Sequence, residues 1–344
     1  MKRTLAVSRL LYFGALITVG LSLVSCAEKP AAPAGIKTRR YALNVVNSSI
    51  PAWLFGNDVL KKMSSVTPGL QTEFGGPTGG EVDKQIEQID ALVARHVNGI
   101  ILCPADPKAL APTVNRALSS GVPIVTIFGD VAGSARLTSI TAAERLSAFA
   151  LVEKVVQDKG WAQGPEKSIQ IMAIITKPGL TFAEERLAGV RDAVAKYRTL
   201  NLVRVVSNEW SDKKGAEQVA ATLQTNPRLR AVFGLDSRAA VGAVTALREA
   251  GKAKGSLVLT GWDTDEDLLK SVAEGWVHCT SAPNMTYMTQ LGISILEAWN
   301  LGYLYPESLK VKEFNLPPLP DHIDVAQTLI DTKNVNAFFR KATQ

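Results

Sequence analysis

Four acidic residues each stand directly after a short apolar run, where a carboxylate can bind a small polar molecule. They are Asp106 and Asp130 in the first half of the chain, and Asp236 and Asp263 in the second half. Ligands of open α/β sheets bind beyond the carboxyl ends of the strands. The spacing therefore predicts a pair of carboxylates at the binding edge of each half. The alternative for each acid is a helix cap or a turn residue, which we favour for Asp106.

The elements that position these acids follow from the hydrophobic pattern. Apolar residues at steps of three and four, as in Val82, Ile86, Ile89 and Val93, indicate helices between the runs. Several runs are apolar almost throughout, as in parallel strands that helices cover on both faces. The alternation predicts an α/β protein with doubly wound parallel sheets. The predicted strands are Tyr41–Val46, Gly99–Cys103, Pro123–Phe128, Ser168–Ile175, Leu202–Ser207, Ala231–Gly234, Leu257–Trp262 and Trp276–Ser281.

Two helix starts carry local signals. Asp106 is predicted as the N-cap of a helix that has Pro107 as its first residue. Thr141 and Glu144 have the spacing of a capping box before another periodic stretch.

Composition describes a folded protein with more than one domain. The chain has 344 residues, of which 46% are apolar and 20% charged, and its formal net charge is +6. Domains average roughly 100–200 residues, so about two are expected, each large enough to fold without disulfides.

Part of the positive charge lies in an N-terminal segment. Lys2, Arg3 and Arg9 precede and flank Leu10–Val24, which contains no charge. This uncharged stretch would span roughly 22 Å as a helix, too short for a bilayer core of about 30 Å. Residues 1–25 are therefore predicted to be a secretory signal peptide. Its removal leaves a small net charge, which argues against a nucleic-acid partner.

The residues around Cys26 predict how the mature chain begins. Leu23-Val24-Ser25-Cys26 resembles a bacterial lipobox, whose cysteine is lipidated and becomes the new N-terminus. The alternative is an ordinary signal peptide with an incidental cysteine. Residues 26–39 are rich in Pro and Ala and are predicted to be a flexible tether to a membrane.

The remaining thiols and imidazoles do not form a reactive site. Cys103 and Cys279 stand in apolar runs and are predicted to be buried free thiols rather than a disulfide. The three histidines have neither catalytic nor metal-binding spacing. We therefore expect no catalytic residue, no metal and no cofactor.

Several segments together resemble a known family, the type 1 periplasmic sugar-binding proteins of ATP-driven (ABC) importers. The resemblance is to ribose-binding and autoinducer-2-binding lipoproteins in particular, and it extends from about Tyr41 to Gly302. The segments that carry it are Gly76–Pro77 with Asp83 and Gln85, residues 98–107, Gly121–Thr126 with Asp130 and Ser134–Arg136, Glu185–Gly189, Ala231–Asp236 and Gly261–Asp263.

The resemblance implies two lobes joined by a three-stranded hinge, with the ligand between them. It implies crossings near Ser139–Thr141 and Pro283–Asn284, and a third before the extended Leu309–Asn315. The N-terminal lobe would then comprise residues 40–140 and 284–308, and the C-terminal lobe residues 141–283 and 309–344.

The resemblance also implies an aromatic sandwich for the ligand. Trp53 stands where the family has a stacking aromatic residue, and Trp210 has the matching position in the other lobe. Aromatic rings suit the C–H faces of a sugar, and charged or amide groups suit its hydroxyls. The alternative is that each indole packs inside its own lobe or wedges the hinge.

For the hydroxyls we expect Asn47 and Asp130 from the first lobe, Asp236 and Asp263 from the second, and Asn284 at a crossing. A turn or cap role is the alternative for these acids.

The chain departs from the family pattern at several positions. Phe128 replaces the first acid of an Asp-x-Asp pair, and Pro283 replaces a Gln, so Asn284 is a neighbouring substitute. Glu184 replaces an arginine of ribose binders. This acid either receives a cationic or amino-bearing group or faces solvent, which we slightly favour. The substrate is therefore expected to be a sugar or sugar-like polyol that differs from ribose.

The predicted function is reversible capture of this ligand and its delivery to an importer permease. The protein would be a monomer at the periplasm or cell surface, held to the membrane by its lipid. A sensory module that presents a bound sugar or furanosyl signal to a membrane receptor is the main alternative. A secreted carbohydrate-active enzyme lacks a supporting motif, and a sugar-responsive repressor would need an N-terminal DNA-binding segment.

Overall fold

The computed structural model describes residues 37–163, 168–304 and 319–339. The predicted signal peptide, Cys26 and most of the predicted tether lie outside these ranges. Among the described helices, none has both the length and the apolar character needed to cross a bilayer.

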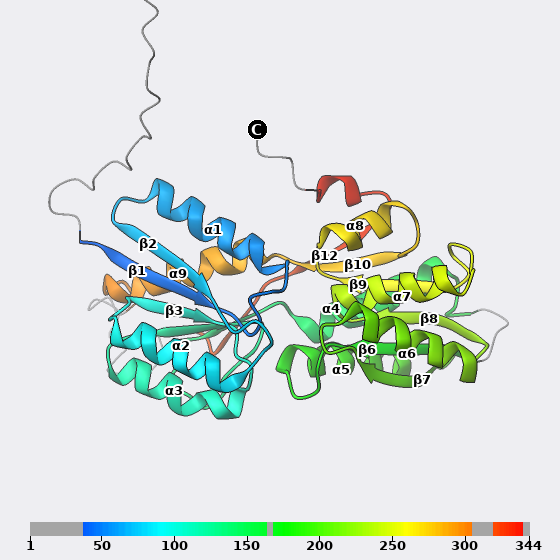
Figure 1. Cartoon of the computed structure of the whole chain (residues 1–344), viewed down its shortest axis with the longest axis horizontal. Helices are drawn as coiled ribbons and strands as arrows, with labels where there is room; N and C mark the ends of the chain where they lie inside the picture. The colour runs from blue at the N-terminus through cyan, green and yellow to red at the C-terminus, as the bar shows by residue number, and fades with distance from the viewer. Residues whose placement is uncertain (1–36, 164–167, 305–318, 340–344) are drawn as a thin grey trace, which may run out of the picture. The chain divides into compact units, whose positions relative to one another are not determined.

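The first of two sheets is wholly parallel and has the strand order β11-β5-β4-β3-β1-β2. Helices cover it, with α1 against α9 and α2 against α3, and we call this assembly the first lobe (Figure 1). Its strands are β1 (Arg39–Asn44), β2 (Leu70–Gly75), β3 (Gly99–Leu102), β4 (Ile124–Ile127), β5 (Ser139–Thr141) and β11 (His322–Asp324). Its helices are α1 (Trp53–Val66), α2 (Val82–Ala94), α3 (Pro107–Ser119) and α9 (Met285–Asn300).

The second sheet has the order β12-β10-β9-β8-β6-β7 and is parallel except for the antiparallel edge strand β12. With its helices it forms the second lobe, in which α4 packs on α5 and α6 on α7 (Figure 1). The strands are β6 (Ile169–Ile175), β7 (Leu200–Ser207), β8 (Leu229–Gly234), β9 (Val258–Trp262), β10 (Cys279–Pro283) and β12 (Gln327–Asp331). The helices are α4 (Glu144–Asp158), α5 (Thr181–Lys196), α6 (Asp212–Thr225), α7 (Ser237–Glu249), α8 (Glu266–Ala273) and the 3₁₀ turn Val335–Ala337.

The predicted fold class is confirmed, because central strands are buried on both faces. Every residue of β3 and of β4 is buried, as expected for strands between two helix layers. The apolar pattern does not predict the strands β2, β5, β11 and β12. β2 has the sequence Leu-Gln-Thr-Glu-Phe-Gly, and its polar residues interrupt the apolar run that would have indicated a strand. β11 has only three residues, too few to give a pattern.

One predicted helix start is confirmed and one is wrong. The side chain of Asp106 accepts from the backbone N–H groups of Lys108 and Ala109 at 2.8 and 3.0 Å, and α3 begins at Pro107. The capping box at Thr141 does not form. Thr141 is the last residue of β5 and donates its hydroxyl to Asp324, and Ala143 precedes α4 instead.

The chain passes between the sheets at three described places, from β5 to α4, from β10 to α9 and from β11 to β12. The first two match the positions expected at Ser139–Thr141 and Pro283–Asn284. The third differs from the expectation that residues 309–344 belong to the second lobe. Residues His322–Asp324 pair with β5 in the first sheet, so this crossing lies between Asp324 and Gln327.

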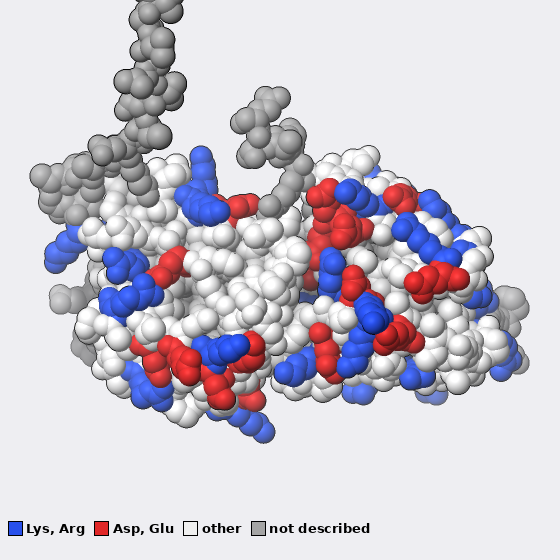
Figure 2. Space-filling view, in the orientation of Figure 1, with Lys and Arg blue, Asp and Glu red and all other residues white. Residues whose placement is uncertain are grey.

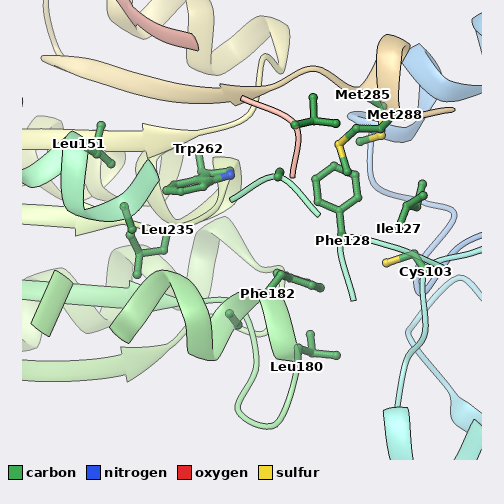
Figure 3. Packing of buried hydrophobic residues seen from close by; sticks show 14 of the residues in the cluster. Cys103, Ile127, Phe128, Leu151, Leu180, Phe182, Leu235, Trp262, Met285 and Met288 are labelled. Carbon is green, nitrogen blue, oxygen red and sulfur yellow. The ribbon is translucent and has the colours of Figure 1, made fainter. Parts of the chain in front are cut away.

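A large buried cluster includes residues from both lobes. Figure 3 shows part of it, with Phe128 beside Met285 and with Phe182 and Trp262 on elements of the second lobe. Cys103 and Cys279 are buried and free, as predicted, and burial raises the pKa of each thiol to about 12. On the face in Figure 2, acidic and basic side chains are interspersed.

Candidate functional site

A pocket lies between the lobes, at the carboxyl ends of strands from both sheets. Six connections and the first turns of four helices, α1, α5, α7 and α9, contribute to its walls, as expected for ligand sites of open α/β sheets. The lining residues are Val46, Ile50, Ala52, Trp53, Phe128, Thr176, Phe182, Arg186, Trp210, Asp236, Ser237, Arg238, Asp263 and Met285. Four predicted site residues are among them: Trp53, Trp210, Asp236 and Asp263.

The aromatic part of the pocket comes from both lobes. Trp53 begins α1 and meets Phe128 edge to face, with ring centroids 5.5 Å apart and an interplanar angle of 89°. Trp210 follows β7 and approaches the first lobe at Gly80, where an added Cβ would lie 3.2 Å from the indole ring. Rings from opposite lobes therefore border one pocket, an arrangement that suits a flat, partly apolar ligand.

Asp236 is the N-cap of α7 and is held in one orientation. Its Oδ1 accepts from the backbone N–H of Ala239 at 2.7 Å and from Asn208 Nδ2 at 3.0 Å, and its Oδ2 accepts from the Thr176 hydroxyl at 3.1 Å. Burial raises its pKa, and these hydrogen bonds partly oppose the rise. The side chain is both a cap and a pocket residue.

Asp263 follows β9 with a φ of 81°, in the left-handed region. Its backbone N–H donates to the Ser281 carbonyl at 2.8 Å, which ties this strained residue to β10. Burial raises the pKa of the carboxyl to about 7; Arg186 opposes the rise, and Asp265, Glu144 and Asp236 add to it. A ligand that donates hydrogen bonds to this carboxylate would stabilise its charged form.

Arg186 projects from α5 into the second-lobe wall and forms a buried ion pair. Its Nε and Nη2 donate to Glu144 at 2.7 and 3.1 Å, and its Nη1 donates to the Leu235 carbonyl at 2.8 Å. The guanidinium also lies over the rings of Trp262 and Phe182, 4.3 and 4.9 Å from their centroids. The charge is therefore fixed in place and largely neutralised by Glu144.

Two predicted residues of the first lobe lie away from this pocket. Asn47 Oδ1 accepts from the Ser49 backbone N–H at 3.0 Å and from the Ser49 hydroxyl at 2.6 Å, which stabilises its own loop. Asp130 is bound by Arg136, whose Nη2 donates at 2.8 Å, and its Oδ2 lies 3.2 Å from His322 Nε2. Asp130 instead lines a neighbouring cavity beside the first and third crossings, together with Thr141, Glu144 and His322, and this cavity shares Phe128 and Phe182 with the main pocket.

The other two predicted residues act at helix starts. Glu184 Oε1 accepts from the backbone N–H of Gly179 at 3.0 Å, and this side chain is exposed in the first turn of α5. Asn284 is the N-cap of α9 and accepts from the Tyr287 backbone N–H at 3.0 Å. Asn284 lines a neighbouring cavity that shares Ala52, Asp263 and Met285 with the main pocket.

Several lining residues were missed from the sequence. Ser237 and Arg238 directly follow Asp236, so the same strand end could have indicated them. Phe128 was noted only as a departure from an acidic pattern. For Met285 and Phe182 no local signal exists, because long-range packing brings α9 and the start of α5 to this place.

The pocket offers aromatic faces, carboxylates and hydroxyl groups, which together suit reversible binding. In the described part of the chain, no cluster of three or more His, Cys, Asp or Glu residues is arranged to hold a metal ion.

Comparison with known proteins gives similarity to binding proteins named for sugars. The chain is 27% identical over 220 residues to a D-ribose/D-allose-binding protein of Pseudomonas aeruginosa, covering 58% of this chain and 62% of that protein. It is 25% identical over 286 residues to the D-allose-binding periplasmic protein of Escherichia coli, covering 80% of this chain and 89% of that protein. The first match thus spans less than two thirds of the relative's length.

Solved structures share the fold. A sugar-binding protein of a sugar ABC transporter from Bacillus halodurans superposes with a TM-score of 0.77 at 20% identity, covering 88% of this chain and all of the other. A family model described as a periplasmic binding protein domain matches residues 50–299, well over half of the chain. The chain therefore belongs to the periplasmic binding protein domain family.

Proposed function

We propose that this protein captures a sugar or sugar-like polyol between its lobes, outside the cytoplasm, and delivers it to an ABC importer. One observation carries the proposal: indole rings from opposite lobes and two second-lobe carboxylates, Asp236 and Asp263, line one pocket. Rings can stack on the C–H faces of a sugar, while carboxylates accept hydrogen bonds from its hydroxyls. The relatives named for ribose and allose support the same class of ligand.

The mechanism is reversible capture without bond making. A ligand between Trp53 and Trp210 touches both lobes, so it binds the closed arrangement more tightly than an open one. Only this difference in affinity shifts the population toward closure. The closed, loaded protein is then the form that the permease subunits recognise.

Binding-panel and substitution measurements test the capture step. Thermal-shift measurements with pentoses, hexoses, amino sugars and polyols should give stabilisation by at least one of them. Asp263→Ala should weaken the binding of that ligand by roughly 2–4 kcal/mol, because charge-assisted hydrogen bonds are lost. Glu266→Ala, in the next helix start and exposed, is the control and should leave affinity unchanged. Equal affinities for all three proteins would remove Asp263 from the site, and no response to any ligand would overturn the proposal.

The N-terminal segment has a proposed role of its own. Residues 1–25 direct export, and lipid on Cys26 tethers the monomeric mature protein to a membrane. Cys26→Ser should then move the protein from the membrane fraction to the soluble fraction, whereas Cys103→Ser, at a buried thiol, should not. Continued lipid labelling of Cys26→Ser would contradict the anchor.

A further inference from the structure

The two walls of the pocket differ in polarity. The first lobe contributes the side chains of Val46, Ile50, Ala52, Trp53, Phe128 and Met285. The second lobe contributes Thr176, Arg186, Asp236, Ser237, Arg238 and Asp263, besides Phe182 and Trp210. Every charged or hydroxyl-bearing side chain among the described lining residues therefore belongs to the second lobe.

Polar side chains of the first lobe near this wall already have partners within their lobe. Asn47 is bonded to Ser49, and Asp130 is bonded to Arg136 and faces the cavity at the crossings. On the second lobe, by contrast, Arg238 carries a buried Nε for which the described residues supply no hydrogen-bond partner. Among the first-lobe lining side chains, the indole N–H of Trp53 is the one conventional hydrogen-bond donor, so most of the hydrogen-bonding capacity of the described pocket side chains lies on the second lobe.

The backbone at Phe128 indicates that the apolar wall is functional. Phe128 has a φ of 61°, a left-handed conformation that a bulky side chain adopts only with strain. Asp, Asn or Gly would occupy this position more easily. Of the six non-glycine residues with positive φ in the described chain, Phe128, Trp210 and Asp263 all line the pocket. Such strain collects at binding sites, where the side chain's position matters to function.

We propose that the ligand is a polyol or sugar with two unlike edges. Its hydroxyls face the second lobe, and an edge bearing a deoxy carbon, a methyl or an O-alkyl group faces Phe128, Trp53 and Met285. A hydroxyl turned toward Ile50, Phe128 and Met285 would lose water without gaining a side-chain donor or acceptor comparable to water, whereas a methyl group there gains burial. This proposal rests on the proposed function and narrows its substrate class.

Calorimetric titration of matched ligand pairs tests the proposal on the parent protein. Suitable pairs are D-galactose with D-fucose, L-mannose with L-rhamnose, and D-glucose with methyl β-D-glucoside. In the pair that binds best, the deoxy or alkylated sugar should bind about 10- to 100-fold more tightly than its fully hydroxylated partner. This is the range by which apolar pockets discriminate against an added hydroxyl group, about 10- to 100-fold. Equal or tighter binding of the fully hydroxylated member in every binding pair overturns this inference alone. Absence of binding by all of these ligands also overturns this inference, and absence of binding across the wider panel of pentoses, amino sugars and polyols overturns the proposed function as well.

Substitutions of Phe128 separate ligand selection from a structural role. Phe128→Asp places a carboxylate on the apolar wall at a φ that Asp tolerates, and Phe128→Leu keeps the wall apolar. The ratio of the two affinities within a pair should fall to near one in Phe128→Asp and should stay as in the parent protein in Phe128→Leu. A purely structural role would weaken both members of a pair equally and leave their ratio unchanged in both variants, which would overturn the assignment of Phe128. If Phe128→Asp does not fold by circular dichroism, Ile50→Asn on the same wall makes the same test.

Discussion

Asp263 lies beside three other carboxylates and one guanidinium, and its protonation depends on all of them. Burial is the largest cause of its raised pKa, Arg186 acts against it, and Asp265, Glu144 and Asp236 add to it, for a value of about 7 against a usual 3.8. The folded protein therefore holds a proton between about pH 4 and pH 7 that the unfolded chain has released. The contribution of this proton to the free energy of unfolding is complete below pH 4 and is lost as the pH rises through 7.

Asp263→Asn should remove this pH dependence. Asn mimics the protonated acid and tolerates the left-handed backbone. The variant should match the parent in unfolding free energy below pH 4, where the acid is protonated in both the folded and the unfolded chain, and should become progressively more stable than the parent as the pH rises from 4 to about 7. Urea denaturation at pH 5, 6, 7 and 8 measures the difference, with Asp267→Asn as the exposed control. A constant difference across this range would contradict the raised pKa.

Trp210 should report ligand binding by fluorescence. Its ring borders the pocket, whereas Trp276 stacks with Arg248 and Lys254 on the second lobe, 5.0 and 5.6 Å from its ring centroid. Trp210→Phe should reduce the ligand-induced emission change to the part that Trp53 contributes, and Trp276→Phe should keep the whole change. Trp210→Ala should weaken binding by about 1 kcal/mol through lost aromatic contact. An unchanged emission response in Trp210→Phe would assign this indole to packing.

At the scale of elements, α4 and α5 pack closely and carry two ion pairs of different burial. Gly189 allows the approach, because a Cβ there would overlap the Arg145 carbonyl oxygen. Glu144 and Arg186 form the buried pair, with side chains 3% and 5% exposed. Arg145 and Asp192 form the exposed pair, 54% and 42% exposed. The two pairs join the same helices at adjacent positions of α4.

Glu144→Gln should destabilise the protein by about 3–5 kcal/mol, because it leaves the buried Arg186 charge uncompensated. Asp192→Asn should lower the unfolding free energy much less, because this ion pair is exposed and its partner Arg145 is hydrated. Urea unfolding of both variants gives the comparison. Similar losses for the two substitutions would show that burial does not set the strength of these pairs.

At the scale of the whole molecule, Gln327 links the three crossings. Its Nε2 donates to the Ala142 carbonyl at 2.7 Å and lies 3.2 Å from Glu144 Oε2, while its Oε1 accepts from the Ser281 hydroxyl at 2.7 Å. Ala142 lies in the first crossing, Ser281 in β10 just before the second, and Gln327 at the end of the third. Through Glu144 the same network reaches Arg186 in the pocket.

Gln327→Ala should lower the unfolding free energy by roughly 1–2 kcal/mol, since it leaves polar groups of two crossings without their partner. Gln71→Ala, on the exposed side of β2, should change it by no more than about 0.5 kcal/mol. Thermal unfolding of both variants measures these changes. A loss at position 327 no larger than at position 71 would mean that the crossings are held by the backbone alone.

Local pattern was sufficient for the fold and for the positions of the strand ends. Continuous apolar runs predict buried parallel strands, and the residues that follow them, including Asp236 and Asp263, must lie at the binding edge. The pattern failed where polar residues occupy a strand, as in β2. It also failed at Thr141, where pairing with β11, about 180 residues later, replaces a helix cap.

Asp130 and Asp263 show what the sequence by itself determined and what only the tertiary structure decided. Both acids follow a strand, and periodicity alone places each at the carboxyl end of its sheet. Their orientations differ because Arg136 and His322 hold Asp130, whereas Asp263 has a strained backbone facing Arg186 and the pocket. Hydrophobic periodicity is a local property of the chain, so the sequence alone determines the sheet edges. The direction of a polar side chain depends on partners distant in sequence, so only the tertiary structure decides which acids face the ligand.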